Sequence, residues 1–545
     1  MQSETISHIR NSRLASLLSP IVCWLISSLV LVLCISSLNH ETLRWDEADY
    51  VMAARKGLMT NALDSTAFTA ADLLHFFKSK FLKSPVTISE TYDEVEDVFL
   101  LRHSHPPMIS YVLNVLGRHR LVPGQEDDQL GVQMAGSIML VAMMIWGYLS
   151  LNQWKADLPG ILTTALLGLH CGFFLSKEIQ CHLWIALTMI PTAIVYGWLL
   201  QNPGPSKALI TGAWAGISFV ALQSGLFVLF WILAGLSVLF IDPKFHQKFQ
   251  DQANSKRKKL LSIIVIAILI LTGFSLSVLV LYPGAFLRLS LLRILGSYAY
   301  TIFKAGEYSS VTKNYTQIMY CVSPVILVTF WGILILGRKI FAHENRRFLA
   351  CVIIGGGYAM ALMKFLLNVT YIIPAASVLA VLGVASISAF KQTHIRWLCA
   401  LITFILVTVT LYSNMNESQF EIASSDMQKL VSLINGQVVF AEGYGVLHFY
   451  CPEKKDQIHK LTFYKNGTLP MVRDRSTLNY RPLEREELAG NMMMVGVFNS
   501  SPPNAFEKSL PDEVQRIQIP GMKGRIYRFP KNYGQRENTK GEPMP

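Results

Sequence analysis

The sequence predicts a polytopic α-helical membrane protein of about eleven transmembrane helices, followed by a small extracytoplasmic α/β domain. Of its 545 residues 52% are hydrophobic and only 15% are charged, whereas soluble domains carry roughly 25% charged residues. The apolar residues gather in runs of about 20, the length that an α-helix needs to cross a bilayer. Most of the chain is therefore expected to face lipid.

The candidate spans are eleven apolar runs, each placed to within a few residues. The first run follows Arg10 and Arg13, is longer than the apolar core of a signal peptide, and is not followed by a cleavage-site pattern. We expect it to be retained as the first span. The runs are 15–38, 129–151, 159–176, 182–200, 208–222, 225–241, 260–281, 317–336, 348–365, 372–390 and 396–412.

The loop charges predict which side of the membrane each loop faces. Basic residues cluster at 256–259, at 338–339 and at 346–347. With a cytoplasmic N-terminus all of these fall on the cytoplasmic side, where Lys and Arg are in excess. An odd number of spans then places the C-terminal end outside the cytoplasm. Because the formal net charge of +12 resides largely in short loops, nucleic acid is not an expected partner.

Two segments are too long to be connectors between spans. They are the first extracytoplasmic loop, 39–129, and the tail, 413–545. The tail should form the α/β domain, and residues 1–412 the transmembrane domain. In the tail, a helix is expected at 424–435. Strands are expected at 437–442, 491–498, 516–519 and 524–529.

The eight cysteines predict neither a zinc site nor a disulfide framework. Seven lie in apolar stretches, where a free thiol behaves as a small hydrophobe, and only Cys451 lies in a polar region. No pair has the spacing of zinc ligands.

The strongest candidate for chemistry lies just after the first span, in residues 44–50 (RWDEADY). Asp46 and Glu47 are adjacent carboxylates beside Trp45 and Tyr50, residue types that anchor at the membrane interface. The carboxylates could activate a hydroxyl group or hold a cation. The alternative is an acidic turn that caps the next helix, since carboxylates favour a helix N-terminus.

A second candidate lies later in the same loop. Arg102, His103 and His105 precede the pair Pro106-Pro107. The prolines are expected to open a short helix, and the guanidinium of arginine suits phosphate because it makes bidentate hydrogen bonds. The alternative is a loop-to-helix turn whose histidines are merely exposed.

Four further candidates lie on the outer side of later spans. Glu178 falls in a tight turn, Lys304 in the loop 282–316, Lys364 at the end of one span and Tyr371 at the start of the next. As alternatives without a catalytic role, Glu178 could cap a helix, and Lys304 and Lys364 could extend their amines to the membrane interface. Ionisable residues near spans are nevertheless commonly functional. Together the candidates predict one extracytoplasmic cavity lined by carboxylates and cations.

In this order, the motifs resemble those of the GT-C membrane glycosyltransferases. The resemblance is closest to the family of protein O-mannosyltransferases and the lipid A aminoarabinose transferase (glycosyltransferase family 39). Members carry an Asp-Glu pair and then a tyrosine in the first outer loop, which Asp46, Glu47 and Tyr50 match. A His-Pro-Pro element matches at 105–107, and a Tyr-Leu-Leu-Pro-like element matches at 371–374.

Four positions depart from the family pattern. Met108 stands where leucine is usual after the proline pair, and Gln180 stands where arginine is usual. His182 stands where tyrosine is usual, and Thr370 where a basic residue is usual. The tail around 443–450 is similar to the outer domain of the aminoarabinose-transferase branch, so the resemblance spans most of the chain.

The resemblance implies an inverting transfer of a sugar from a polyprenyl-phosphate donor to an acceptor hydroxyl on the extracytoplasmic side. Asp46 is expected to act as general base, a role worth about 10²–10⁴-fold, and Glu47 to orient Asp46 or the acceptor. Their adjacency alone does not decide which is the base. Glu178 would hold sugar hydroxyls or a cation, and Tyr50 and Tyr371 belong to the substrate-binding set. The expected cationic stabilisers of the leaving phosphate are Arg102, His103, His105, Lys304 and Lys364.

No cofactor is required by the sequence. A divalent metal near these carboxylates and histidines is compatible with it, although no ligand spacing demands one. The acceptor is expected to be a lipid, a glycan or a protein. Only the first outer loop is long enough for an inserted domain, and it holds the motifs, which favours a bacterial-type enzyme in the plasma membrane.

Two other functional classes remain open. A transporter or flippase of a lipid-linked sugar would also have many spans and ionisable residues, but it has little use for a long outer loop with paired carboxylates. A non-catalytic, glycan-binding membrane scaffold would use the carboxylates only for binding.

Overall fold

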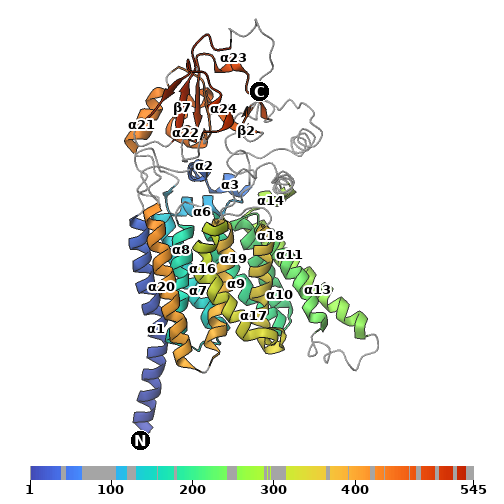
Figure 1. Cartoon of the computed structure of the whole chain (residues 1–545). Helices are drawn as coiled ribbons and strands as arrows, with labels where there is room; N and C mark the ends of the chain where they lie inside the picture. The colour runs from blue at the N-terminus through green and yellow to red at the C-terminus, as the bar shows by residue number, and fades with distance from the viewer. Residues whose placement is uncertain are drawn as a thin grey trace.

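The structure is a computed structural model of the chain (Figure 1). The residues that it describes are 2–37, 45–63, 106–118, 130–155, 157–176, 181–241, 255–287, 291–292, 295, 315–363, 369–390, 392–417, 424–434, 436–442, 444–464, 467–473, 480–496, 503–519 and 524–534.

A bundle of apolar helices forms the larger part of the molecule, and the described residues of every predicted apolar run lie almost entirely in helix. In the described part of the chain, eight helices are long and apolar enough to cross a membrane. Three segments are shorter or broken, so the predicted number of crossings stays a prediction. The helices are α1 (Gln2–Ser36), α7 (Leu130–Leu151), α8 (Leu158–Leu175), α9 (Cys181–Gln201), α10 (Pro205–Ala221), α11 (Gly225–Gly235) with η3 (Leu236–Ile241), α13 (Ser255–Leu281), α16 (Tyr315–Leu336), α17 (Arg346–Cys351) with α18 (Gly357–Met363), α19 (Val369–Ser388) and α20 (Thr393–Glu417).

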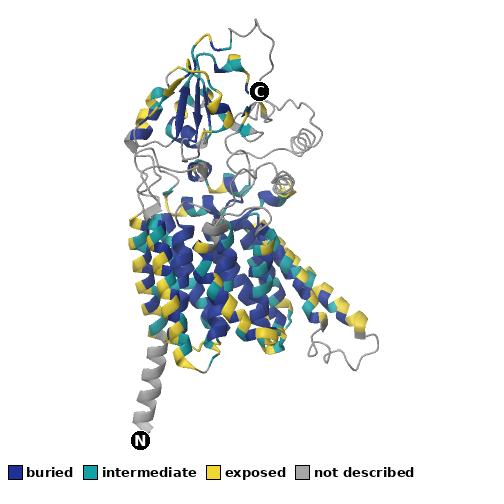
Figure 2. Cartoon of the chain, in the orientation of Figure 1, coloured by how far each residue is buried: buried dark blue, intermediate teal, exposed yellow. Residues whose placement is uncertain are grey.

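The burial of the helices separates a central set from an outer set (Figure 2). The apolar windows of α8, α9 and α19 are 83%, 94% and 78% buried, whereas those of α1, α13 and α20 are only 28%, 33% and 28% buried. The exposed side chains of the outer helices are themselves apolar, for example Leu29 of α1 and Phe404 of α20. A helix whose side chains are apolar all round, but which other helices cover on one side only, is expected where lipid covers the remaining side.

Glycines allow the closest approach between helices. A Cβ atom on Gly332 of α16 would lie 2.5 Å from the Cα of Gly383 on α19. A Cβ atom on Gly136 of α7 would lie 2.5 Å from a methyl group of Leu183 on α9. Small residues at such crossings are typical of helix packing in membranes.

One span is not a regular helix. Between α17 and α18, residues Val352–Gly356 form a π-helical turn, η6. Three consecutive glycines, 355–357, end the turn and begin α18, and a Cβ atom on Gly357 would lie 2.6 Å from the ring of Trp231 on α11. The sequence predicted a plain span here; the wider turn and the missing side chains let α11 pack against it.

Among the residues that the structure describes, four short helices lie between the bundle and the C-terminal domain (Figure 1). They come from the two outer loops and include the helix that the proline pair was predicted to open, since α6 begins directly after Pro107. The four are α2 (Trp45–Arg55), α3 (Leu58–Leu63), α6 (Met108–Val115) and α14 (Gly284–Leu287).

In its described residues, the C-terminal domain is built on a seven-stranded sheet with the order β4-β3-β2-β1-β5-β7-β6. β1 pairs in parallel with β2 and β5, and the remaining pairs are antiparallel. The sequence predicted β1, β5, β6, β7 and α21, and these are confirmed; β2, β3, β4 and α22 were not predicted. The elements are α21 (Ser424–Leu433), β1 (Val439–Ala441), α22 (Tyr444–Tyr450), η7 (Pro452–Gln457), β2 (Ile458–Tyr464), β3 (Leu469–Arg473), β4 (Tyr480–Pro482), α23 (Arg485–Leu488), β5 (Met492–Val495), α24 (Ala505–Lys508), β6 (Gln515–Ile517) and β7 (Arg525–Arg528).

The alternation of side chains along the strands gives this sheet two apolar faces. Val439 and Ala441 of β1 belong to a cluster that includes Leu447 of α22 and is continuous with the core of the helix bundle. Phe440, between them, belongs to a second cluster that includes Phe506 of α24. The domain therefore packs on the bundle side through one face of its sheet and covers the other face itself.

Candidate functional site

Helix α2 carries the acidic motif at the boundary between bundle and outer domain. Its first turn contains Asp46 and Glu47, where carboxylates interact favourably with the helix dipole. Side chains on several sides of the helix are buried, among them Tyr50, Val51 and Ala54. Such burial is expected of a helix enclosed by two layers, and it excludes the reading of this segment as a simple solvated turn.

Glu47 is a buried carboxylate. It is only 1% exposed, and its Oε1 accepts a hydrogen bond from Nε2 of Gln133 on α7 at 3.3 Å. Gln133 is itself 2% exposed. Because an ionised carboxylate is costly to bury without partners, a glutamate in this position requires polar neighbours, and Gln133 is one of them.

The outer ends of α7 and α9 bring further polar groups to the same level of the bundle. Gly136 and Leu183 are in close contact, and Gln133 and His182 each lie within one turn of this contact on their own helices. The imidazole of His182 packs edge-on against the ring of Tyr371 at the start of α19, with ring centroids 4.1 Å apart. Ser176, fully buried at the end of α8, lies at the same end of the bundle.

Helix α6 fixes the position of α2. Asn114 of α6 donates a hydrogen bond from Nδ2 to the carbonyl oxygen of Ala54 at 2.9 Å. Tyr111 donates one to the carbonyl oxygen of Leu281, at the end of α13, at 2.5 Å. Pro106 and Pro107 are both buried. The Pro-Pro motif therefore begins a helix that joins α2 to the bundle.

The outer domain covers α2 from the other side. The guanidinium of Arg55, in the last turn of α2, lies over the ring of Phe449 of α22, 4.8 Å from its centroid. Partial burial lowers the pKa of Arg55 from its ordinary value. Phe449 is 1% exposed, so this cation–π contact belongs to a packed interface between the acidic helix and the domain.

The structure describes only part of the predicted set of site residues. Glu47, Tyr50 and Tyr371 are described, and they lie on α2 and at the outer end of α19. Asp46 lies in α2, but its side chain is outside what the structure describes. The predicted residues that lie outside the described part of the chain are Arg102, His103, His105, Glu178, Lys304 and Lys364.

The sequence motifs did not include Gln133, the hydrogen-bond partner of Glu47, and they included His182 only as a departure from a pattern. The available signal was a polar side chain near the end of an otherwise apolar run. Within the described residues, no group of three His, Cys, Asp or Glu side chains could hold a metal ion.

A second buried polar cluster lies deeper in the bundle and is a structural one. Nε2 of His170 on α8 lies 2.7 Å from the carbonyl oxygen of Cys321, and its Nδ1 lies 3.3 Å from Oγ1 of Thr410. Both ring nitrogens thus have partners on other helices, α16 and α20, and the histidine joins three helices.

The sequence matches no protein-family profile and no curated protein. The fold is similar to the crystal structure of ArnT from Cupriavidus metallidurans bound to undecaprenyl phosphate, with a TM-score of 0.44 and 12% identity over 93% of this chain and 97% of that one. It is also similar to the crystal structure of the Archaeoglobus fulgidus oligosaccharyltransferase in complex with Zn and sulfate, with a TM-score of 0.39 and 14% identity over 78% of this chain. This chain spans only 61% of the length of the latter protein. Both TM-scores are below 0.5, so the function proposed next is based on the residues of this chain.

Proposed function

We propose that the chain is an integral membrane glycosyltransferase of the GT-C type. It moves a sugar from a polyprenyl phosphate to an acceptor hydroxyl on the extracytoplasmic side, with inversion at the anomeric carbon. The observation that carries the proposal is the buried Glu47 on a helix enclosed between an apolar bundle and a folded outer domain. A lipid-linked sugar would use both parts of this arrangement. Its isoprenoid chain must stay in the hydrocarbon beside the apolar bundle, and its phosphate and sugar must stay at the membrane interface, where α2 lies.

The two carboxylates take different roles in this proposal. Glu47 is hydrogen-bonded within the protein, through Gln133, and acts as a positioning residue. Asp46 acts as the general base. It removes the proton of the acceptor hydroxyl while the hydroxyl oxygen forms a bond to the anomeric carbon and the bond from that carbon to the phosphate oxygen breaks. The polyprenyl phosphate leaves with the electron pair of that bond.

The leaving phosphate needs cations more than a proton donor, since it is already a stable anion. Arg102, His103, His105, Lys304 and Lys364 are proposed for this task, and Glu178 for contacts to the sugar. His182 and Tyr371, in contact with each other at the outer end of the bundle, are proposed to line the sugar site. The acceptor class is a lipid, a glycan or a protein, and a divalent metal is proposed only as an optional partner of the carboxylates.

The test uses the full-length protein in lipid with radiolabelled polyprenyl-phosphate sugars. Asp46→Asn is expected to lower the release of free polyprenyl phosphate by about 10²–10⁴-fold, as loss of a general base does, with donor binding retained. Glu47→Gln should lower the rate less, because the amide oxygen can still accept from Gln133. Asp49→Asn makes the same change in charge on the same helix and should leave the rate near that of the wild type.

The rival classes give different results. Full turnover by Asp46→Asn would remove Asp46 from the mechanism. Donor binding without turnover in the wild type would favour a glycan-binding scaffold. Movement of intact donor across vesicles, without cleavage, would favour a transporter.

A further inference from the structure

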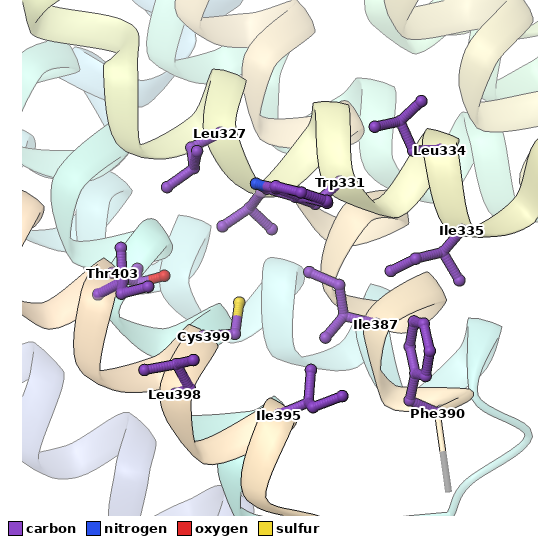
Figure 3. A pocket seen from close by; sticks show the side chains of 12 residues that line it. Leu327, Trp331, Leu334, Ile335, Ile387, Phe390, Ile395, Leu398, Cys399 and Thr403 are labelled. Carbon is purple, nitrogen blue, oxygen red and sulfur yellow. The ribbon is translucent and has the colours of Figure 1, made fainter. Parts of the chain in front are cut away.

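An apolar cavity lies at the other end of the bundle from the acidic helix. It has a volume of about 530 Å³ and lies between α16, α19 and α20 (Figure 3). Its walls include Leu327 and Trp331 of α16, Ile387 of α19, Phe390, and Leu398 and Thr403 of α20. Ile387 follows Tyr371 by 16 residues on one helix, which is about 24 Å at 1.5 Å per residue. The cavity is therefore separate from the candidate active site.

The dimensions of the cavity suit one acyl chain. On α16 the lining runs from Leu327 to Ile335, eight residues, so the cavity extends over about 12 Å along this helix. That is within the roughly 15 Å of one leaflet, half of the roughly 30 Å hydrocarbon thickness. A volume of about 530 Å³ holds on the order of 18 methylene groups if each takes roughly the 30 Å³ of a liquid water molecule.

The cavity is accessible from the lipid side. Trp331, Leu334 and Leu398 in its walls are 53%, 53% and 55% exposed, and they belong to α16 and α20, two helices of low burial. Apolar side chains that are exposed at this depth meet hydrocarbon in a membrane. The groove is thus a place where a lipid chain can lie between two spans rather than on their surface.

Basic residues lie next to the lining residues at one end of the cavity, which we call its mouth. The lining residues Leu334 and Ile335 are followed within one turn by Arg338 and Lys339, in the short helix η4 (Gly337–Phe341). Both basic side chains are exposed, and among the described residues no carboxylate pairs with either. On the other wall, the lining residue Ile395 follows the exposed His394. Basic groups beside pockets between spans attract anionic lipid headgroups.

We propose that this cavity binds an anionic phospholipid of the leaflet on the N-terminal side of the bundle, with one acyl chain between α16 and α20 and the headgroup on Arg338 and Lys339. The charge at the mouth is what favours an acidic headgroup over a zwitterionic one. The proposal does not depend on the glycosyltransferase reaction, because the site lies at the opposite end of the bundle.

Trp331 provides a direct probe. The protein is placed in mixed micelles with phosphatidylglycerol or phosphatidylcholine that carries brominated acyl chains, and the Trp331 signal is taken as the difference between wild type and Trp331→Phe. Half-quenching is expected at an about fivefold to 25-fold lower mole fraction of the brominated phosphatidylglycerol, since each of the two basic groups near an anionic headgroup contributes about 1 kcal/mol, or about fivefold.

The variants separate the site from general membrane charge. Arg338→Gln with Lys339→Gln should remove the preference, whereas Lys256→Gln with Arg257→Gln, which removes two exposed charges at the start of α13, should keep it. Thr403→Phe places a larger side chain in the cavity and should reduce the preference for phosphatidylglycerol, while quenching by bulk lipid at the exposed face of Trp331 remains.

Two results would overturn the proposal. Equal quenching by the two brominated lipids would mean ordinary contact with bulk lipid. Release of quenching by unbrominated polyprenyl phosphate, but not by unbrominated phosphatidylglycerol, would assign the cavity to a polyprenyl chain instead.

Discussion

At the scale of single residues, burial decides the roles of the acidic groups. Glu47 is a buried carboxylate and Glu442 a half-buried one; the first accepts a hydrogen bond from Gln133 and the second from the backbone N–H of Gly496, which donates to its Oε2 at 2.9 Å. Burial raises the pKa of Glu442, and the nearby Glu507 raises it further. Glu487 is the opposite case, since its hydrogen-bonded Arg481 lowers its pKa.

These opposite pKa shifts predict opposite pH dependences. For Glu442 the folded state binds the proton more tightly than the unfolded state, so its contribution favours folding at low pH and is lost as the pH rises through its raised pKa. Glu442→Gln should therefore raise the melting temperature of the outer domain at pH 7.5 relative to wild type, with no gain at pH 4.

The matched substitution Glu487→Gln should behave in the reverse way. Because the pKa of Glu487 is lowered in the folded state, its ionised form stabilises the fold at a pH above the ordinary pKa of glutamate, and this stabilisation is lost as the pH falls. The variant should therefore be less stable than wild type at pH 7.5 and closer to it at pH 4. Thermal melts of both variants at the two pH values check this; shifts of the same sign and size would contradict the assigned environments.

At the scale of elements, the packing of the bundle depends on how closely its helices approach one another. The position of the acidic motif depends on the elements that enclose α2. The bundle helices α16 and α19 meet at Gly332 and Gly383 with no room for a Cβ atom. Helix α2 is joined to α6 by Asn114 and to α22 by the contact of Arg55 with Phe449. The acidic motif is thus positioned by two segments that lie far from it in the sequence.

Gly332→Ala tests the closeness of α16 and α19. The added Cβ would lie 2.5 Å from the Cα atom of Gly383, so the helices must move apart, at a cost of about 1–3 kcal/mol typical of overpacking. A lower melting temperature in detergent is expected. Gly356→Ala is the control, because its Cβ would meet only Val352, at 4.0 Å; an equal loss in both variants would contradict the packing argument.

At the scale of the whole molecule, charge and domain placement favour one orientation in the membrane. Arg338 and Lys339 follow the end of α16, and Lys256 and Arg257 lie at the start of α13. The other end of α13, at Leu281, contacts α6 near the outer domain. These basic groups therefore lie on the face opposite the domain, which, by the excess of Lys and Arg in cytoplasmic loops, we expect to be the cytoplasmic one.

Cysteine labelling tests this orientation. Ser432→Cys places a thiol on an exposed position of the outer domain, and Lys256→Cys places one on the basic face. A membrane-impermeant maleimide added to intact cells should label the first variant and should label the second only after permeabilisation. The wild-type chain, whose described cysteines are buried or half-buried, gives the background. Labelling in the reverse order would place the domain in the cytoplasm.

The sequence by itself determined the membrane class, the positions of the apolar helices, the short helix after Pro107 and half of the outer domain. Hydropathy and turn chemistry are local, so runs of about 20 apolar residues and a proline pair are sufficient to locate these elements. The strands β2 to β4 were missed because their sequence, such as IHKLTFY in β2, mixes polar and apolar residues without a strong apolar run. The sequence also singled out Glu47, Tyr50 and Tyr371, through their order in a motif.

Only the tertiary structure decided what surrounds these residues. Gln133 lies 86 residues from Glu47, and Phe449 is even farther along the chain from Arg55, so no local pattern predicts either contact. The π-helical turn in one span and the cavity beside Trp331 likewise arise from helices that meet in space. The physical reason is that burial and charge pairing depend on packing between distant segments, whereas hydropathy and helix initiation depend on neighbours in the sequence.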